Sequence, residues 1–328
     1  MRSALNRNEI LDILQMPEGV FYRDIVPLSQ RAADESFSNH LLVTSMIGYS
    51  NICKNNCLYC GMRASKNQIE RYRLPPEQVV ETCLKAKNQG FERTFLISGE
   101  DPRYGFENIL SIVSQLKKEN MWISLACGEF SRSQFEELKS AGVDEYVLKF
   151  EMSNPEHFNQ LNPSTSFNKR MQAIDEVKSL GLNLASGNIV DWPGQSLEEL
   201  ADDILLMHEL DISWAPVIPY LPAKNTPLAV SGHRGDLLKL YKEIAILRLL
   251  MPRVNITAQQ PGKDLTKGLS DIEGNLAAID VGANVLFFDL LSDVEAKSFR
   301  VIDDRNITGP SHIFKLAEVS GKALIVSR

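Results

Sequence analysis

The regular alternation of short apolar runs with longer segments of helical periodicity, from residue 41 onward, is the strongest constraint on this fold. Such alternation is typical of βαβ units, in which helices join parallel strands of one sheet. The predicted strands are Leu41–Ile47, Arg93–Ser98, Met121–Cys127, Glu145–Phe150, Leu182–Ile189, Ile212–Tyr220, Asn255–Ala258 and Asn284–Phe288.

The segments between these runs carry the signals of helix ends. Pro75–Gly90 begins with prolines and ends in glycine, Ser131–Gly142 begins with serine caps, and Ser166–Gly181 also ends in glycine. Eight β/α repeats without a long polar linker predict an α/β fold, a single (β/α)8 TIM-type barrel. A doubly wound open sheet is the alternative, because strand order cannot be read from sequence.

The repeat also suggests how the chain is divided. Residues 1–40 are predicted to form an N-terminal helical extension, residues 41–290 the barrel, and residues 291–328 a C-terminal extension packed on it. The stretch Asp289–Asn306 is rich in acidic residues without a regular ligand spacing, and we predict a solvated loop there.

Composition indicates which ligands and which cellular compartment to expect for this chain. The 35 basic and 42 acidic side chains give a net charge of −7 without a basic block, so nucleic acid is not an expected ligand. The N-terminus lacks the pattern of a signal peptide, and no apolar run reaches the length of about 20 residues that a membrane span needs. We expect a cytoplasmic protein.

Three of the five cysteines lie within eight residues, directly after the first predicted strand. Cys53, Cys57 and Cys60 are too close in sequence for an ordinary disulfide framework. A structural zinc ion and an iron–sulfur cluster both usually take four protein ligands. Three cysteines therefore suggest a cluster with one iron open to chemistry, whereas the isolated Cys83 and Cys127 are expected to be buried apolar residues.

The order C-x3-C-x2-C, with aromatic Tyr59 before the last cysteine, resembles the signature of radical S-adenosylmethionine (radical SAM) enzymes. The resemblance implies a [4Fe-4S] cluster whose unique iron binds S-adenosylmethionine. It further implies an electron donor such as flavodoxin or ferredoxin, and a 5′-deoxyadenosyl radical that abstracts hydrogen from a substrate. Tyr59 is placed beside that cofactor by the same resemblance.

Further cofactor contacts are implied at the ends of other strands. Ser98, Gly99 and Glu100 match the family segment that meets the cofactor's amino group, and an ammonium needs such acceptors. Glu151 matches the residue that binds the ribose or methionine part. Arg170 matches an arginine that binds the cofactor's carboxylate, for which a guanidinium fork is well suited.

Longer segments, from about residue 40 to 290, resemble the biotin-synthase-like branch that contains the [FeFe]-hydrogenase maturase and methylornithine synthase. The pocket residues depart from both precedents. Lys149, Gln259 and Gln260 would offer hydrogen bonds to a substrate carboxylate or similar anion. The aromatic side chains expected to shield the radical are Phe95, Trp214 and Tyr220.

Three functions remain open at this point. The first is a radical SAM enzyme acting on a small amino-acid-like substrate, by rearrangement of its carbon skeleton or by fragmentation. The second is a maturase of the [FeFe]-hydrogenase cluster acting on an organoiron precursor. The third is a noncatalytic metal-binding protein that uses the same cysteines structurally.

Overall fold

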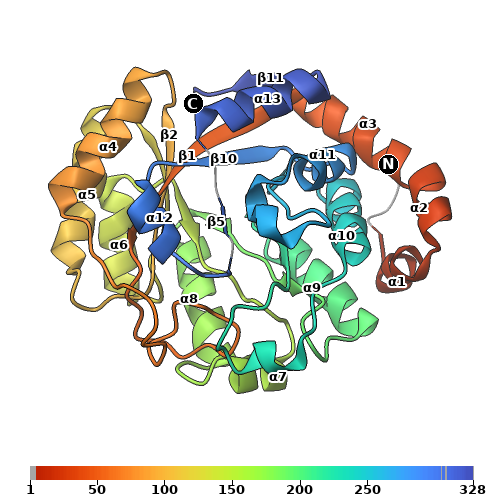
Figure 1. Cartoon of the computed structure of the whole chain (residues 1–328), viewed down its shortest axis with the longest axis horizontal. Coiled ribbons are helices and arrows are strands. Elements are labelled where there is room, and N and C mark those ends of the chain that lie inside the picture. The colour runs from red at the N-terminus through yellow and green to blue at the C-terminus, as the bar shows by residue number, and fades with distance from the viewer. Residues whose placement is uncertain (1–4, 304, 307–308, 328) are drawn as a thin grey trace.

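The computed structural model describes residues 5–303, 305–306 and 309–327. Within them, parallel strands follow one another around a ring in the order β10-β1-β2-β3-β4-β5-β7-β9. A parallel bridge between Thr257 and Val285 joins the two ends of this order, and the Ala258 N–H donates to the Val285 carbonyl at 2.8 Å. Helices lie outside the strands (Figure 1). The predicted TIM-type barrel is confirmed.

The strands are β1 (His40–Ser50), β2 (Arg93–Ser98), β3 (Trp122–Ala126), β4 (Glu145–Val147), β5 (Asn183–Ala185), β6 (Ile189–Val190), β7 (Trp214–Ala215), β8 (Ile218–Pro219), β9 (Asn255–Ile256), β10 (Val285–Asp289) and β11 (Ala323–Ile325). All eight predicted runs contain a strand. Two runs divide: β6 and β8 leave the ring and pair with each other. Pro216, which has no N–H to donate, lies at the break between β7 and β8.

The helices are α1 (Arg7–Gln15), α2 (Glu18–Asp24), α3 (Val26–Phe37), α4 (Pro76–Asn88), α5 (Phe106–Lys118), α6 (Arg132–Ala141), α7 (Pro155–Leu161), α8 (Phe167–Ser179), α9 (Leu197–Glu209), α10 (Leu237–Leu250), α11 (Ile272–Asp280), α12 (Asp293–Ser298) and α13 (Pro310–Ser320), with 3₁₀ turns η1 (Leu228–Ser231) and η2 (Leu265–Ser270).

Local sequence explains the ends of these helices. The Ser131 hydroxyl accepts from the Gln134 N–H at the start of α6, and the Gln134 side chain returns the bond. Gly142 ends the same helix with φ 104°, a conformation that costs glycine little. At the start of α8, the Ser166 hydroxyl accepts from the Lys169 N–H. The three helices predicted from prolines, serines and glycines are therefore all present.

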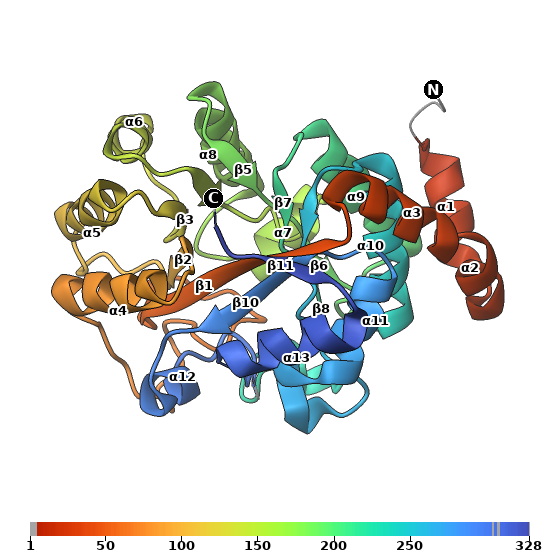
Figure 2. The ribbon, with the colours of Figure 1, turned by 90° about the horizontal axis from the view of Figure 1, so that it is seen from above.

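The first three helices and the last strand lie outside the ring of barrel strands. Helices α1–α3 follow one another along one side (Figure 2), and Arg7 on α1 pairs with Asp202 on α9 at 2.6 Å. At the other terminus, β11 runs parallel to the start of β1. The division at residues 40 and 290 stays a prediction. Among the described helices, none is both long and apolar enough to cross a bilayer.

The prediction of a solvated loop over Asp289–Asn306 is wrong. The segment contains α12, after which Phe299 is fully buried and both Ile302 and Arg305 are at most 9% exposed. The acidic residues give the segment a polar average, but Phe299 and Ile302 turn inward over the barrel, whereas Val294 is exposed. This segment forms part of the site described next.

Candidate active site

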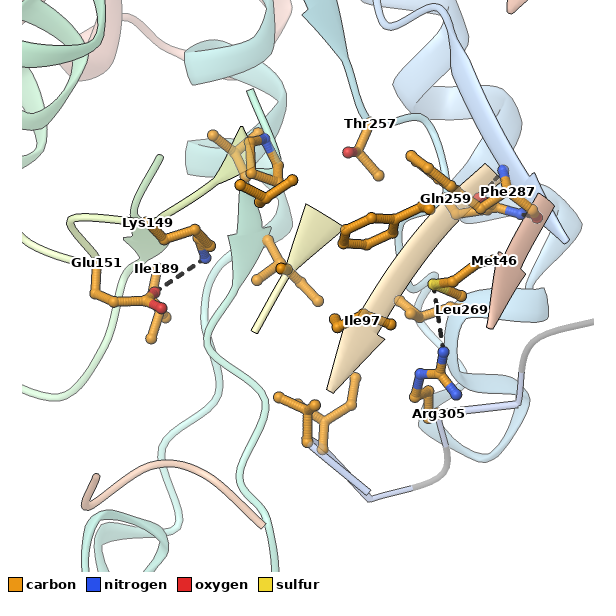
Figure 3. A pocket seen from close by; sticks show the side chains of 18 of the residues that line it. Met46, Ile97, Lys149, Glu151, Ile189, Thr257, Gln259, Leu269, Phe287 and Arg305 are labelled. Atoms are coloured by element: carbon orange, nitrogen blue, oxygen red, sulfur yellow. Dashed lines mark hydrogen bonds and ion pairs between the residues drawn. The ribbon is translucent and has the colours of Figure 1, made fainter. Parts of the chain in front are cut away.

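A cavity of about 390 Å³ opens at the carboxyl ends of the barrel strands (Figure 3). In a β/α barrel this end carries the catalytic groups, because the loops after the strands meet there. Most of the lining is apolar. The residues of the cavity whose side chains carry charge are Lys149, Glu151, Arg170 and Arg305.

The cysteine loop, residues 53–61, follows β1 at this end. Leu58 N–H donates to the Leu161 carbonyl at 2.8 Å, and Gly61 N–H donates to the Val301 carbonyl at 2.9 Å. These bonds tie the loop to α7 on one side and to the C-terminal segment on the other. The loop is therefore fixed by the barrel and not only by a metal.

Arg71 holds the chain that follows the cysteine loop. Its guanidinium donates to the carbonyls of Asn51, Met62, Arg63 and Lys66 at 2.6 to 3.1 Å. Burial raises the pKa of the Cys53 thiol, and the positive charge of Arg71 lowers it in part. A partly buried cation beside several thiols lowers the cost of ionising them.

The three thiols lie close to one another. Burial, followed by the nearby Cys53, raises the pKa of Cys57 to about 12. Burial, followed by Cys57, raises the pKa of Cys60 to about 12 as well. N–H groups of Asn55 and Met62 point at the sulfurs of Cys53 and Cys60 at 3.5 and 3.4 Å. Such bonds stabilise cluster thiolates.

These features fit the predicted [4Fe-4S] cluster. Three half-buried free thiols gather on one loop, with backbone donors and a cation around them. In the described residues, no group of three or more histidine, cysteine or acidic side chains is arranged to hold one metal ion. A cluster does not need that arrangement, because each cysteine binds a separate iron.

The end of β2 comes very close to the cysteine loop. A Cβ added to Gly99 would lie 2.3 Å from the Ile52 carbonyl oxygen and 2.9 Å from the Cys53 Cβ. Only glycine permits this approach. The Gly99 N–H donates to the Ser50 carbonyl at 2.9 Å, and the Ser98 hydroxyl donates to the Gly99 carbonyl at 2.7 Å.

Glu100 faces the same loop. Its carboxylate pairs with Lys54 at 2.5 Å and accepts from Asn55 Nδ2 at 2.6 Å. A Cβ on Gly128, after β3, would lie 2.3 Å from the Glu100 side chain. The predicted segment 98–100 is thus brought beside the cysteines, although of its three residues only Ser98 lines the cavity.

Lys149 and Glu151 point to the same side after β4, as their alternation predicts (Figure 3). Their side chains pair at 3.0 Å. Glu151 has φ 61°, which is uncommon for a residue with a side chain. Its N–H donates to the Gly187 carbonyl at 3.0 Å, and its carbonyl accepts from Ile189 N–H at 2.9 Å. These two bonds hold the strained residue in place.

Asp203 on α9 is hydrogen-bonded to residues on either side of Glu151 in the fold. Its carboxylate accepts from Ser153 N–H at 2.7 Å, from Gln195 Nε2 at 2.8 Å and from Asn188 Nδ2 at 3.2 Å. Burial raises the pKa of Asp203 to about 7. The nearby Glu243 is fully buried, and burial raises its pKa as well. Sequence reasoning did not single out either residue.

Arg170 and Tyr59 line the cavity together with Lys149 and Glu151. Arg170 Nε donates to Glu129 at 2.8 Å, and its Nη1 donates to the Lys149 carbonyl. Burial opposes ionisation of Glu129, but Arg170 outweighs it and keeps the pKa of Glu129 below its usual value. The Tyr59 hydroxyl donates to Asn162 at 2.7 Å. We call Tyr59, Lys149, Glu151 and Arg170 the polar wall.

The two predicted glutamines are occupied by the backbone. Gln259 lines the cavity, but its amide donates to the Phe287 carbonyl and accepts from the Phe287 N–H at 2.5 Å. Gln260 is fully buried, donates to the carbonyls of Val217 and Thr257, and is not among the lining residues. Their predicted contact with substrate stays untested, whereas Phe95, Trp214 and Tyr220 do line the cavity.

The opposite wall contains residues that the sequence analysis missed. We call Met46, Phe287, Phe299, Ile302 and Arg305 the apolar wall, because Arg305 is its only charged member. Three of these come from the segment predicted as a solvated loop. The apolar Phe299 and Ile302 within an acidic stretch were the one available sign that the segment packs inward.

Comparison with known proteins agrees with this geometry. The model of the radical SAM superfamily matches residues 47–207. The [FeFe] hydrogenase maturase subunit HydE of Thermotoga maritima is 33% identical over 285 residues, which are 87% of this chain and 80% of the relative. The 3-methylornithine synthase of Methanosarcina acetivorans is 29% identical over 81% of this chain and 74% of its own length.

The crystal structure of methylornithine synthase (PylB) superposes with a TM-score of 0.85 at 25% identity, covering 99% of this chain and 95% of that one. The resemblance drawn from the cysteines and strand ends is confirmed, and the relatives are enzymes, which removes the noncatalytic alternative. The chain belongs to the radical SAM superfamily and is an enzyme that uses that family's [4Fe-4S] cluster and S-adenosylmethionine.

Proposed function

We propose that this enzyme abstracts hydrogen from a small amino-acid-like substrate and rearranges or fragments its carbon skeleton. The observation that supports this most is the lining of the cavity, which lies beside the cysteine loop. The lining is mainly apolar, with charged side chains on the polar wall and at Arg305. An apolar enclosure suits radical chemistry because few groups in it can react or admit water.

The bound cluster and S-adenosylmethionine supply a 5′-deoxyadenosyl radical once a reductant delivers an electron. We assign the binding of the cluster to Cys53, Cys57 and Cys60. Ser98, Gly99 and Glu100 lie beside these cysteines and are proposed to meet the cofactor's amino group, with the Glu100 carboxylate held by Lys54 and Asn55.

The polar wall is proposed to hold the rest of the cofactor. Glu151 offers its carboxylate to the ribose or methionine part of S-adenosylmethionine. Arg170 is already oriented by Glu129, and its remaining N–H groups are offered to the carboxylate of S-adenosylmethionine. Tyr59 fixes the side of the pocket next to the cysteines. For the electron donor we propose a small one-electron carrier such as flavodoxin or ferredoxin.

A second function is kept because of one observation. The hydrogenase maturase subunit is more similar in sequence, at 33% identity, than the methylornithine synthases, at 29% and 27%. This chain would then act on an organoiron precursor. The experiment below distinguishes the two substrates.

The test is anaerobic. Protein reconstituted with iron and sulfide receives dithionite, S-adenosylmethionine and a panel of perdeuterated L-amino acids, and both 5′-deoxyadenosine and its deuterium content are measured. We expect 5′-deoxyadenosine from the wild type, none from Cys57→Ala, and deuterium transfer from at least one amino acid. Cleavage without transfer from any of them would overturn the amino-acid substrate and leave the organoiron precursor to be tried.

A further inference from the structure

We propose that Arg305 is the residue that recognises the carboxylate of the substrate, and that the substrate is a monocarboxylate whose side chain has an apolar stem packed against the apolar wall. The reaction that follows binding rests on the proposed function. The binding site itself is inferred from the geometry of the apolar wall alone. Sequence analysis assigned that task to Lys149, Gln259 and Gln260.

The other candidates are already engaged. Lys149 pairs with Glu151 at 3.0 Å, and Arg170 is bound to Glu129 at 2.8 Å and to a backbone carbonyl. Gln259 gives its amide to the backbone of β10, as described above. Lys149 and Gln259 would each have to give up a buried polar contact before meeting a substrate, which is costly. The remaining donors of Arg170 are already assigned to the carboxylate of the cofactor.

Arg305 differs because its donors are incompletely used. Its side chain is 9% exposed and lines the cavity. Nη1 lies 3.0 Å from Asp289, but Nη2 lies 3.5 Å from the sulfur of Met46, which is only a weak acceptor. A guanidinium has five N–H donors, and its planar fork matches a carboxylate. The described residues thus leave this buried cation with donors for a ligand.

The surroundings select the class of anion. Asp289 already offsets much of the charge of Arg305, so the site suits a single negative charge better than a phosphate, which carries nearly two. The neighbouring lining is Met46, Ile97, Leu269 and Phe287 (Figure 3). These side chains would bury the apolar stem of the substrate's side chain, and a polar group on that stem would find no partner there.

Hydrogen bonds connect the segment that carries Arg305 to the cysteine loop and to the residue Asn51 before it. Asn51 Nδ2 donates to the Ser298 carbonyl at 2.8 Å, and Gly61 N–H donates to the Val301 carbonyl at 2.9 Å. The Arg305 guanidinium then lies 4.8 Å from the Phe299 ring centre. The segment that carries the carboxylate anchor is therefore bonded to the loop that carries the cysteines. That bond sets where along the substrate hydrogen is removed.

The test compares matched ligands on the anaerobic holoenzyme with S-adenosylmethionine. L-Leucine, L-lysine and L-cysteine are each paired with the corresponding primary amide, and dissociation constants are measured by equilibrium dialysis of labelled ligand. Wild-type protein is expected to bind at least one acid about tenfold or more tightly than its amide. Arg305→Gln should remove that preference, and Arg305→Lys should keep part of it.

Two further variants serve as controls. Arg300 is on the same segment but is exposed and outside the cavity, so Arg300→Gln should prefer acid over amide as strongly as the wild type does. Asp289→Asn frees Arg305 from its counter-ion and should tighten acid binding, an effect that a damaged fold would not give.

Equal binding of acids and amides by the wild type, unchanged preference in Arg305→Gln, or tighter binding of inorganic phosphate than of any acid would each overturn the proposal. Acid binding that depends on Arg305 without hydrogen abstraction would instead count against the proposed function alone. Abstraction from an amino acid that is indifferent to Arg305→Gln would count against the carboxylate anchor alone.

Discussion

The two walls of the cavity are built by different forces. On the polar wall, charged and hydroxyl groups meet partners at 2.7 to 3.0 Å: Tyr59 meets Asn162, Lys149 meets Glu151, and Arg170 meets Glu129. On the apolar wall, the side chains pack without such partners except for Arg305, its only charged member, which pairs with Asp289 at 3.0 Å.

This difference indicates which side of the cavity suits binding of a cofactor and which side suits selection of a substrate. Directed polar contacts fix positions to within a few tenths of an ångström, which a shared cofactor requires. Apolar packing accepts other side chains of similar volume at lower cost. We therefore expect changes on the cysteine side to affect every substrate alike and changes on the apolar wall to alter the choice of substrate.

The largest effect is expected from Gly99→Ala. Its new Cβ would lie 2.3 Å from the Ile52 carbonyl, so the cysteine loop must move. We expect iron content to fall and 5′-deoxyadenosine formation to drop by about a hundredfold or more, in proportion to the lost cluster. Gly19→Ala is the control, because nothing lies within 4 Å of its added Cβ. A variant with full iron and normal activity would contradict the close approach.

A smaller effect is expected from Glu129→Gln. Arg170 would lose its buried carboxylate partner while the cysteine loop stays intact. We expect affinity for S-adenosylmethionine to fall about tenfold, because the guanidinium is no longer held toward the cavity. Equilibrium binding to the reconstituted protein measures this, with iron content as the internal check. Glu136→Gln, at an exposed ion pair on α6, serves as the matched variant and should bind normally.

Much of the fold was readable because its evidence is local. Hydrophobic runs, Ser131 before α6 and Gly142 after it report on their own neighbourhoods. The cysteine loop is readable for the same reason, since three ligands lie within eight residues. What failed was the estimate of burial over Asp289–Asn306, because burial there depends on a barrel assembled from residues far away in sequence.

The substrate side shows the same limit. Gln259 and Gln260 were chosen as substrate ligands from their place after a strand, but whether an amide is free depends on the backbone opposite, here Phe287 and Val217. Arg305 could not be chosen, because nothing in its local sequence brings it to Met46, 259 residues away along the chain. Non-local pairing is set by the whole fold.

A test confined to the apolar wall is Gly48→Ala. The added Cβ would lie 2.6 Å from the Phe299 ring, which must shift, while the cysteines keep their contacts. We expect full iron content and normal affinity for S-adenosylmethionine, but a substrate KM about fivefold higher. Adding Phe299→Leu should restore part of the loss. If S-adenosylmethionine affinity fell as much as substrate affinity, the two walls would not be separable.

The smallest effect on catalysis is expected from Asp203→Asn, which bears on the support behind the polar wall. Burial raises the pKa of Asp203 to about 7 from a usual 3.8, so between these pH values the folded state holds a proton that the unfolded state has lost. Stability therefore falls as pH rises through that window and levels off above it.

The melting temperature of the wild type should consequently drop by a few degrees between pH 5 and pH 8, and the drop should be smaller in Asp203→Asn. Glu243, whose pKa burial also raises, keeps part of the slope, and Glu199 nearby acts on Asp203 in the same direction. Activity at pH 7 should change no more than about twofold, because asparagine can still accept from Ser153 N–H. An unchanged slope would mean that Asp203 is ionised throughout, and that water or a cation reaches the support behind Glu151.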